Sequence, residues 1–381
     1  MIIFERKLEK KIRPLLFKKR AILIFGPRQV GKTTLAKKLL AEYSETNFGA
    51  DSYFNCDETV VRNYFKLGNP HLLKELVGER KLVVFDEAQT IQNIGKILKV
   101  FIDTYPDVQI IATGSSSFDL ANKINEPLTG RSFEFTLYPL SLQEIKASKE
   151  VTHGELLEIM RLGSYPAIVG EENVEARESL LKNITTNYLY KDIFLFEAIK
   201  NPQIFEDLIK ALAYQIGNEV SVSELSELLK TSRANIDKYL RLLEQSYVIK
   251  RVRSYSRNGR NELKKASKIY FIDTGIRNAV LGDISASLEG RNDKGLLFEN
   301  FIFLELLKKS SEKVFAPQIF FWRTRDQKEV DFVEVDGEKI NAYECKWQAE
   351  NVRFASFLKL YPKAKTQVVT PESLLEPKKP N

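Results

Sequence analysis

One short stretch constrains the fold of this 381-residue chain more than any other. An apolar run at residues 22–25 leads into Gly26-Pro-Arg-Gln-Val-Gly31-Lys32-Thr33, and a helical pattern with leucines on one face follows. Buried strand, glycine-bounded loop and helix are the context of a phosphate-binding loop, because the glycines let backbone N–H groups curl toward phosphate oxygens. A chance Gly-Lys-Thr turn would not need the strand or the helix. The sequence therefore predicts an α/β fold with a parallel sheet that binds a nucleotide.

The loop residues have separate expected roles. Lys32 is placed to reach the β- and γ-phosphates, and Thr33 to bind Mg²⁺. The N-terminus of the following helix adds partial positive charge. ATP and Mg²⁺ are therefore the expected cofactors. The residues expected to line the nucleotide are Gly26, Pro27, Arg28, Gln29, Val30, Gly31, Lys32, Thr33 and Thr34.

A second apolar strand, at residues 81–85, ends in the carboxylates Asp86 and Glu87. Asp86 is expected to hold Mg²⁺ through its water shell, and Glu87 to orient or deprotonate the attacking water. The alternative is a strand that merely ends in a solvated acidic turn. The position downstream of a phosphate-binding loop favours ATP hydrolysis.

Two further residues are candidates for the same site. The strand at residues 109–113 would lie beside the Asp86 strand, with Ser115 at the carboxyl edge where nucleotides bind. Arg131 follows a glycine and is a candidate phosphate sensor or arginine finger, acting in its own chain or on a neighbouring copy. The alternatives are a simple Gly-Ser loop and a structural ion pair.

Residues 2–148 together resemble the AAA+-type P-loop ATPases. Within that superfamily, the Gly-Pro-Arg-Gln-Val-Gly-Lys-Thr loop, the Asp-Glu-Ala-Gln tetrad and the Gly-Arg-Ser-Phe segment resemble one prokaryotic group of soluble ATPases with an additional C-terminal domain. The resemblance implies ATP hydrolysis and a nucleotide site that a neighbouring copy completes, hence a homo-oligomer. The helical pattern at residues 149–205 is interpreted as the small lid of the ATPase.

Residues 206–275 show the order helix, turn, helix, hairpin, which is typical of a winged helix-turn-helix. Ser221 is expected to cap the first helix, residues 233–245 form the second, and Asn258-Gly259 is a strong hairpin signal. Basic and amide side chains on both elements suit DNA, although a winged helix can also bind protein. The expected DNA contacts are Arg233, Asn235, Lys238, Arg241, Arg251, Arg253 and Arg257.

A second chemical site is expected within residues 276–381. Glu344 and Lys346 are two apart on a predicted strand and share one face, while Asp331 on the neighbouring strand can reach the same spot. Two carboxylates can bind Mg²⁺ or Mn²⁺, and a lysine beside them can polarise water. The order helix, three strands, helix, strand resembles the PD-(D/E)XK restriction-endonuclease-like fold, which implies that Glu299 is the acidic residue of its first helix.

The C-terminal segment departs from that family pattern at two positions. Cys345 occupies the usually apolar middle of the Glu-x-Lys triplet, and Val330 stands where a proline is usual. A small buried cysteine behaves as a hydrophobe, so the first change is tolerable. The alternative is a nuclease-like fold that has lost cleavage and serves for binding.

Composition narrows the possible classes. The net charge of +7 permits an anionic partner such as DNA without establishing one. Two cysteines provide neither a disulfide framework nor a cysteine zinc site. No apolar run approaches the roughly 20 residues that span a bilayer, and early charges argue against a signal peptide, so a cytoplasmic protein without membrane contact is expected.

The sequence thus predicts four consecutive parts in an α/β protein. They are a P-loop NTPase core with a parallel sheet at 1–148, a helical lid at 149–205, a winged helix-turn-helix at 206–275, and a small restriction-endonuclease-like domain at 276–381. The predicted function is ATP hydrolysis coupled to DNA binding or metal-dependent DNA cleavage. The alternative is a nucleotide-switched DNA-binding or assembly module with an inert nuclease-like domain.

Overall fold

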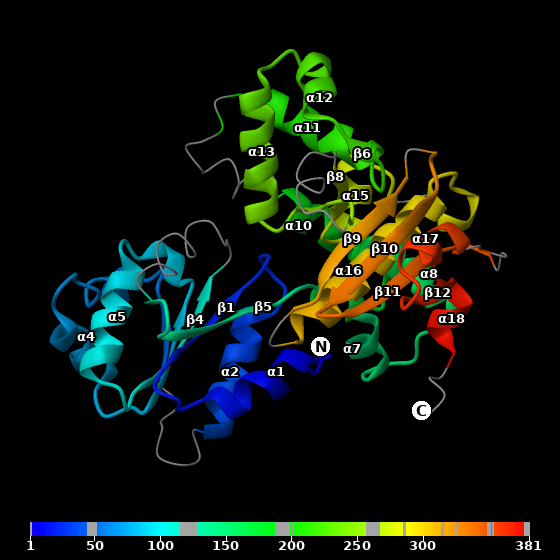
Figure 1. Cartoon of the computed structure of the whole chain (residues 1–381). Helices are drawn as coiled ribbons and strands as arrows, with labels where there is room; N and C mark the ends of the chain where they lie inside the picture. Colours follow the sequence, from blue (N-terminus) through cyan, green and yellow to red (C-terminus); the bar gives the residue numbers. More distant parts are fainter. Residues whose placement is uncertain are drawn as a thin grey trace. The chain divides into compact units, whose positions relative to one another are not determined.

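The structure, a computed structural model, divides the chain into two compact units (Figure 1). The N-terminal unit comprises Glu5–Pro139 and Gln245–Tyr247, and the C-terminal unit comprises Met1–Phe4, Leu140–Glu244 and Val248–Asn381. The described residues are 2–43, 52–114, 128–186, 199, 201–256, 267–284, 287–313, 316–324, 326–348, 352 and 354–376.

The N-terminal unit is built on a five-stranded sheet in the order β2-β3-β4-β1-β5. Every neighbouring pair is parallel, and β3 lies beside β4 as predicted. All residues of β1, β3 and β4 are buried, as expected for strands covered on both faces. The strands are β1 (Ala21–Phe25), β2 (Tyr53–Asn55), β3 (Leu82–Asp86), β4 (Gln109–Gly114) and β5 (Ser132–Thr136).

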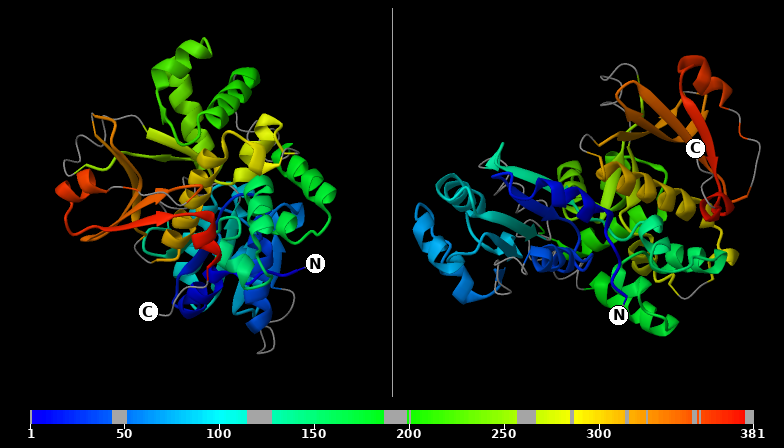
Figure 2. Two further views of the ribbon diagram at one scale, coloured as in Figure 1. Left: turned by 90° about the vertical axis from the view of Figure 1, so that its right-hand side faces the viewer. Right: turned by 90° about the horizontal axis from the view of Figure 1, so that it is seen from below.

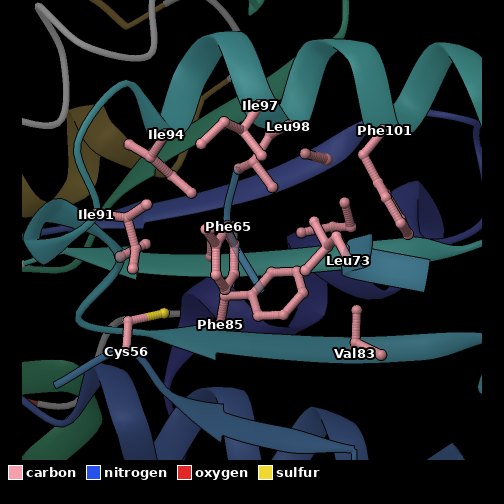
Figure 3. Packing of buried hydrophobic residues seen from close by; sticks show 14 of the residues in the cluster. Cys56, Phe65, Leu73, Val83, Phe85, Ile91, Ile94, Ile97, Leu98 and Phe101 are labelled. Carbon is pink, nitrogen blue, oxygen red and sulfur yellow. The ribbon is translucent and has the colours of Figure 1, made fainter. Parts of the chain in front are cut away.

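Apolar side chains fix the sheet of this unit against its helices. Figure 3 shows Phe85 of β3 packing on Phe65, and Leu98 and Phe101 of α5 belong to the same cluster of buried residues. The packing anchors the end of β3 immediately before Asp86. The helices are α1 (Lys7–Ile12), η1 (Arg13–Leu15), α2 (Lys32–Tyr43), α3 (Thr59–Arg62), α4 (Pro70–Val77), η3 (Ala88–Thr90) and α5 (Ile94–Thr104).

The C-terminal unit begins with helices that pack around α15. Helices α8 and α10 both contact α15, and α8 also contacts α16. The segment predicted to be the ATPase lid, 149–205, therefore lies in the C-terminal unit, and its lid role stays a prediction. These helices are α7 (Leu142–Lys146), α8 (His153–Leu162), α9 (Pro166–Val169), α10 (Val174–Thr185) and α15 (Thr274–Leu281).

Three helices and a three-stranded antiparallel sheet follow in the same unit. The strand order is β6-β8-β7, and Ser221 caps α12 by accepting a hydrogen bond from the Glu224 amide. The predicted hairpin turn at residues 258–259 lies outside the described residues. The elements are α11 (Pro202–Tyr214), β6 (Glu219–Val220), α12 (Val222–Leu228), α13 (Arg233–Gln245), β7 (Ile249–Val252) and β8 (Ser267–Phe271).

A four-stranded mixed sheet, in the order β12-β11-β10-β9, completes the chain (Figure 2). Only β11 and β12 pair in parallel, and α16 contacts β9 and β11. The elements are η5 (Leu288–Gly290), α16 (Lys294–Ser311), β9 (Gln318–Arg323), β10 (Glu329–Asp336), β11 (Lys339–Cys345), α17 (Ala355–Leu360), β12 (Lys365–Val369) and α18 (Pro371–Leu375).

The two sheets of the C-terminal unit are joined by a short pairing between residues 253–255 and β9. Ser254 and Phe321 form a parallel bridge. The Tyr255 amide donates to the Phe321 carbonyl at 2.6 Å, and the Phe321 amide donates to the Arg253 carbonyl at 3.0 Å. The predicted boundary between residues 275 and 276 falls inside α15, so the four-part division stays a prediction.

The sequence also predicts that the chain has no membrane-spanning segment. Among the helices that the structure describes, none is both long enough and apolar enough to cross a bilayer.

Candidate functional site

The loop between β1 and α2 has the backbone shape that its glycines permit. Gly26 has φ +145°, and a Cβ there would lie 2.1 Å from the Leu137 carbonyl oxygen, so no larger residue fits. Gly31 has φ +95°, a backbone angle that residues with a side chain rarely adopt. The segment after β5 therefore approaches the loop so closely at Gly26 that only a glycine fits there.

Lys32 closes this loop. Its ammonium donates hydrogen bonds to the carbonyls of Gly26 at 2.9 Å and Pro27 at 2.8 Å, and the residue is only 5% exposed. Burial lowers the pKa of Lys32 to about 8, against the opposing attraction of Glu87 and Asp86. A phosphate group in the loop would offset this loss of hydration, so the site suits an anion.

Asp86 is surrounded by hydroxyl groups from three other elements. Its Oδ2 accepts from Thr33 Oγ1 at 2.7 Å and from the Tyr53 hydroxyl at 2.6 Å, and its Oδ1 accepts from Thr113 Oγ1. The motif residues Thr33 and Asp86 are thus brought together as predicted, although they are 53 positions apart in the sequence.

These oxygen donors fit Mg²⁺, which proteins usually hold with one or two carboxylates plus substrate phosphates. Within the described part of the chain, no group of three or more His, Cys, Asp or Glu side chains could hold a metal by itself. Thr33 and Asp86 would therefore share the ion with the phosphates rather than form a complete cage.

Glu87 leaves the strand direction. Its backbone is left-handed, with φ +52° and ψ +41°, and its amide donates to Thr113 Oγ1 at 3.2 Å. The carboxylate is half-buried and accepts from Gln89 Nε2 at 2.5 Å. β3 therefore ends at Asp86, and Glu87 lies in the turn that follows it.

The remaining two candidates for this site have different outcomes. Ser115 lies outside the described residues. Arg131 precedes β5 at the opposite edge of the sheet, where its carbonyl accepts from the amide of Ala21, the first residue of β1. The five residues of β1, at about 3.3 Å each, separate it from the loop.

Arg131 instead forms an ion pair, Nε to Asp103 Oδ1, at 2.7 Å. A sensor role within its own chain is therefore wrong, because Arg131 lies at the amino end of β1 and the loop follows the carboxyl end of that strand. The alternative of a structural ion pair holds, and action on a neighbouring copy stays a prediction.

Sequence reasoning missed three residues around the loop. Arg6 donates to the carbonyls of Val30 at 2.8 Å and Tyr138 at 2.5 Å, and so ties the loop to the segment after β5. Thr113 and Tyr53 hold Asp86. Thr113 could have been found, since it ends the strand whose edge was already singled out; Arg6 and Tyr53 carried no local signal.

A second carboxylate site forms in the C-terminal unit. Phe332 pairs with Tyr343, which places Asp331 on β10 opposite Glu344 on β11. Asp331 Oδ2 accepts from the Cys345 amide at 2.7 Å, and Lys346 Nζ lies 3.7 Å from Glu344 Oε2. The structure thus brings together the three residues that the sequence predicted to share one spot.

Glu299 joins this site through residues that sequence reasoning missed. Its Oε1 accepts from Lys268 Nζ at 3.1 Å and from the Tyr270 hydroxyl at 2.5 Å, both on β8. Lys268 is buried and also forms an ion pair with Glu329. Lys268 and Tyr270 lie in an ordinary strand pattern, so nothing in the sequence distinguished them.

Burial dominates the electrostatics of this second site. It raises the pKa of Glu344 to about 8, with the Asp331 charge adding to the effect. It raises the pKa of Glu299 to about 7 against the pull of Lys268, and it also raises the pKa of Asp331. A divalent cation that binds to such partly protonated carboxyl groups would displace their protons.

The predicted DNA contacts are distributed over α13 and the strand after it. Arg233, Asn235 and Arg241 are exposed on α13, Lys238 is half-buried, and Arg253 is exposed; Arg257 lies outside the described residues. Arg251 differs, because its guanidinium forms an ion pair with Glu244 at 2.6 Å. Its charge is compensated within the protein, which weakens the prediction of a phosphate contact there.

Three family models match consecutive segments of the chain. Residues 18–146 match a family model described as an AAA domain. Residues 154–287 and 294–378 match two models described as domains of unknown function, DUF8612 and DUF4143. An uncharacterized protein of Haemophilus influenzae is 28% identical over 273 residues, covering 69% of this chain and 64% of its own length. This chain therefore spans slightly less than two thirds of that relative.

Another uncharacterized protein, from Methanocaldococcus jannaschii, is 26% identical over 382 residues, covering 95% of this chain and 81% of its own. Among solved structures, AMPPCP-bound DnaA from Aquifex aeolicus overlaps with a TM-score of 0.31 and 13% identity, covering 62% of this chain and 86% of its own. Overlap at that level does not establish a shared overall fold. Residues 18–146 thus match a model described as an AAA domain, and they form the five-stranded parallel sheet and the glycine-bounded loop that are typical of a P-loop NTPase fold.

Proposed function

We propose that this protein binds ATP with Mg²⁺ and hydrolyses it at the loop after β1. The observation that carries the proposal is the buried Lys32 ammonium across the loop, beside a Thr33 hydroxyl already hydrogen-bonded to Asp86. Lys32 and the loop amides bind the phosphates. Thr33 and Asp86 hold Mg²⁺, which when bound neutralises charge that develops on the phosphates.

Glu87 is the proposed general base. Its half-buried carboxylate takes a proton from the water that attacks the γ-phosphorus, and Gln89 fixes its orientation through the 2.5 Å hydrogen bond. The bond from water oxygen to phosphorus forms as the bond to the leaving ADP oxygen breaks. The left-handed backbone of Glu87 keeps this carboxylate separate from Asp86.

The direct test is nucleotide binding and turnover in Lys32→Ala. Loss of the main phosphate cation should abolish both, measured with a fluorescent ATP analogue and by phosphate release. Lys38→Ala is the matched control, because Lys38 lies on the same helix and pairs with Glu9 at 2.9 Å. Undiminished binding in Lys32→Ala, with normal folding, would refute the nucleotide site.

A second function is proposed for the C-terminal unit. Its sheet order β12-β11-β10-β9, preceded by α16, supports a PD-(D/E)XK-like fold, and the adjacent Asp331, Glu344 and Lys346 support a metal-dependent nuclease. Asp331 and Glu344 would hold Mg²⁺ or Mn²⁺, which supplies an activated water when bound. Glu299 would act from α16, held by Lys268 and Tyr270.

DNA is the proposed substrate and partner. The order α11, β6, α12, α13, β7, β8 and the sheet order β6-β8-β7 support a winged helix, and the exposed Arg233 and Arg241 on α13 suit phosphate contacts. The coupling of nucleotide state to DNA, a homo-oligomer in which Arg131 completes a neighbouring site, and the cytoplasmic location remain parts of this proposal.

Cleavage of supercoiled plasmid with Mg²⁺ or Mn²⁺ separates the two versions of the C-terminal function. An active site predicts nicking that disappears in Asp331→Ala. Asp336→Ala is the control, since Asp336 lies on the same strand and is exposed, paired with Lys313 at 2.8 Å. DNA binding without cleavage by the wild-type protein would favour the alternative, a binding or assembly module with an inert nuclease-like fold.

A further inference from the structure

The second oxygen of Asp86 receives two hydroxyl groups, and one of them is outside every predicted motif. Tyr53 lies on the edge strand β2, and its hydroxyl donates to Asp86 Oδ2 at 2.6 Å. Thr33 of the loop donates to the same oxygen at 2.7 Å. Tyr53 therefore touches the carboxylate that the proposed function assigns to Mg²⁺.

The ring of Tyr53 is itself held in place. Lys37 Nζ lies 4.1 Å from the ring centroid, a cation–π contact, and Lys37 is one helical turn after Thr33 on α2. The Tyr53 hydroxyl is the donor and the Asp86 carboxylate oxygen the acceptor, 2.6 Å apart. The contact is thus a hydroxyl-to-carboxylate hydrogen bond of fixed direction.

The orientation of Asp86 follows from these contacts. Thr113 donates to Oδ1, so hydroxyl groups hold both oxygens and the carboxylate plane cannot turn freely. Without Tyr53, Thr33 would be the one remaining donor to Oδ2 among the described residues, and Thr33 must also serve the metal. The Tyr53 hydroxyl is neither part of the loop nor a proposed metal ligand. It could therefore keep Asp86 oriented both with and without bound Mg²⁺.

We propose that Tyr53 is a positioning residue that orients Asp86 for Mg²⁺. The inference rests on the proposed ATP site and deepens it, because it separates the residue that sets metal affinity from those that bind phosphates. Outer contacts that orient metal ligands typically contribute about 10- to 100-fold to metal affinity. Tyr53→Phe should therefore raise the Mg²⁺ requirement without weakening the phosphate contacts.

The experiment titrates Mg²⁺ against equilibrium binding of a fluorescent ATP analogue, with the full chain and without reliance on turnover. In Tyr53→Phe the half-saturating Mg²⁺ concentration should rise about 10-fold, while binding in EDTA stays at the wild-type value. Tyr105→Phe is the matched control. It makes the same chemical change in the same unit, removing a hydroxyl that is hydrogen-bonded to His71 at 2.6 Å.

A second variant keeps the hydroxyl and loosens only the ring. Lys37→Met should shift the Mg²⁺ requirement in the same direction by a smaller factor, and it tests the idea should Tyr53→Phe fail to fold. Unchanged Mg²⁺ requirements in the folded variants would overturn the role of Tyr53 while leaving the nucleotide site intact. A wild-type protein that binds no nucleotide would instead overturn the proposed function and this inference with it.

Discussion

The two carboxylate sites of this protein both use Asp and Glu side chains, but different groups surround the carboxylates. At the loop after β1, hydroxyl groups of Thr33, Tyr53 and Thr113 surround Asp86. At the second site, burial and mutual proximity raise the pKa values of Asp331, Glu344 and Glu299, and lysines compensate only part of the charge. A metal that binds at the second site must displace protons from these carboxyl groups.

The difference also follows from how each site is assembled. The loop and its lysine come from one stretch of eight residues, and Asp86 is added from β3, two strands away from β1 in the sheet. The second site combines α16, β10, β11 and β8, so its charges are balanced only after the C-terminal unit has folded. Five substitution or pH experiments test this contrast, in order of decreasing expected effect.

The largest expected contrast is between Glu87→Gln and Glu344→Gln. Glutamine at position 87 removes the proposed base and should slow ATP turnover by roughly 10²-fold or more, with nucleotide binding retained. Glutamine at position 344 imitates the protonated carboxyl that burial favours, so folding should be unharmed while Mn²⁺ binding is lost. Phosphate release and calorimetric Mn²⁺ titration measure the two effects.

Turnover unchanged in Glu87→Gln would remove Glu87 from the base role. Mn²⁺ binding unchanged in Glu344→Gln would show that the second site is not a metal site.

Next in size is the effect of removing the buried lysine. Lys268→Met leaves Glu299 and Glu329 without their shared cation, and breaking a buried ion pair costs on the order of 3–5 kcal/mol. Lys313→Met breaks an exposed pair with Asp336 and should cost at most about 1 kcal/mol. Urea unfolding of both variants gives the comparison. Equal losses would mean that the cluster around Glu299 is hydrated rather than buried.

The pH dependence should differ in sign between the sites. Glu344 has a pKa of about 8 in the folded protein, above its ordinary value of 4.5. The folded state therefore binds the extra proton, and stability of the C-terminal unit should fall as the pH rises from about 4.5 to 8 in the absence of metal. Lys32 has a pKa lowered from 10.5 to about 8, so its contribution to stability should rise between pH 8 and 10.5.

Metal binding follows the same logic at the second site. Cations compete with protons there, so Mn²⁺ affinity should increase up to about 10-fold per pH unit between pH 6 and 8, because one proton is released. Calorimetry in buffers of different ionisation enthalpy would detect that proton. Constant Mn²⁺ affinity over this range would contradict the raised pKa of Glu344.

The smallest effect is expected on DNA binding. Arg241→Gln, at an exposed position on α13, should lower the slope of log K against log salt by roughly 0.9, the value of one phosphate contact. Arg251→Gln should change it less, because Glu244 already compensates that arginine. Fluorescence anisotropy with a labelled duplex over a range of salt measures both. Identical slopes for wild type and Arg241→Gln would indicate that α13 faces protein instead.

How far sequence reasoning reached depended on the distance between cooperating residues. The loop, the Asp86 strand and its neighbour could be predicted because each carries a contiguous pattern of apolar residues and special side chains. Asp331, Glu344 and Lys346 could be placed together because strand alternation is local. Lys268 and Tyr270 could not, since only the packing of β8 on α16 brings them to Glu299.

Arg131 shows the opposite error. A short motif after a glycine suggested a phosphate contact, but the parallel pairing of β5 with β1 places the residue before β5 at the wrong edge of the sheet. The residues around Arg131 gave no information on which end of the strands it would occupy. Tyr53 was missed for a different reason, because an aromatic residue on an edge strand is ordinarily a packing residue.

The pairing of residues 253–255 with β9 has a practical consequence for anyone who dissects the chain. β9 is the last strand of its sheet, and this short segment covers its outer hydrogen-bonding groups. A fragment that begins at residue 276 would expose that edge and also lose Lys268, leaving Glu299 buried without its cation. Such a fragment should aggregate, whereas a longer one that begins at Leu140 retains both partners and is the fragment to purify for crystallisation.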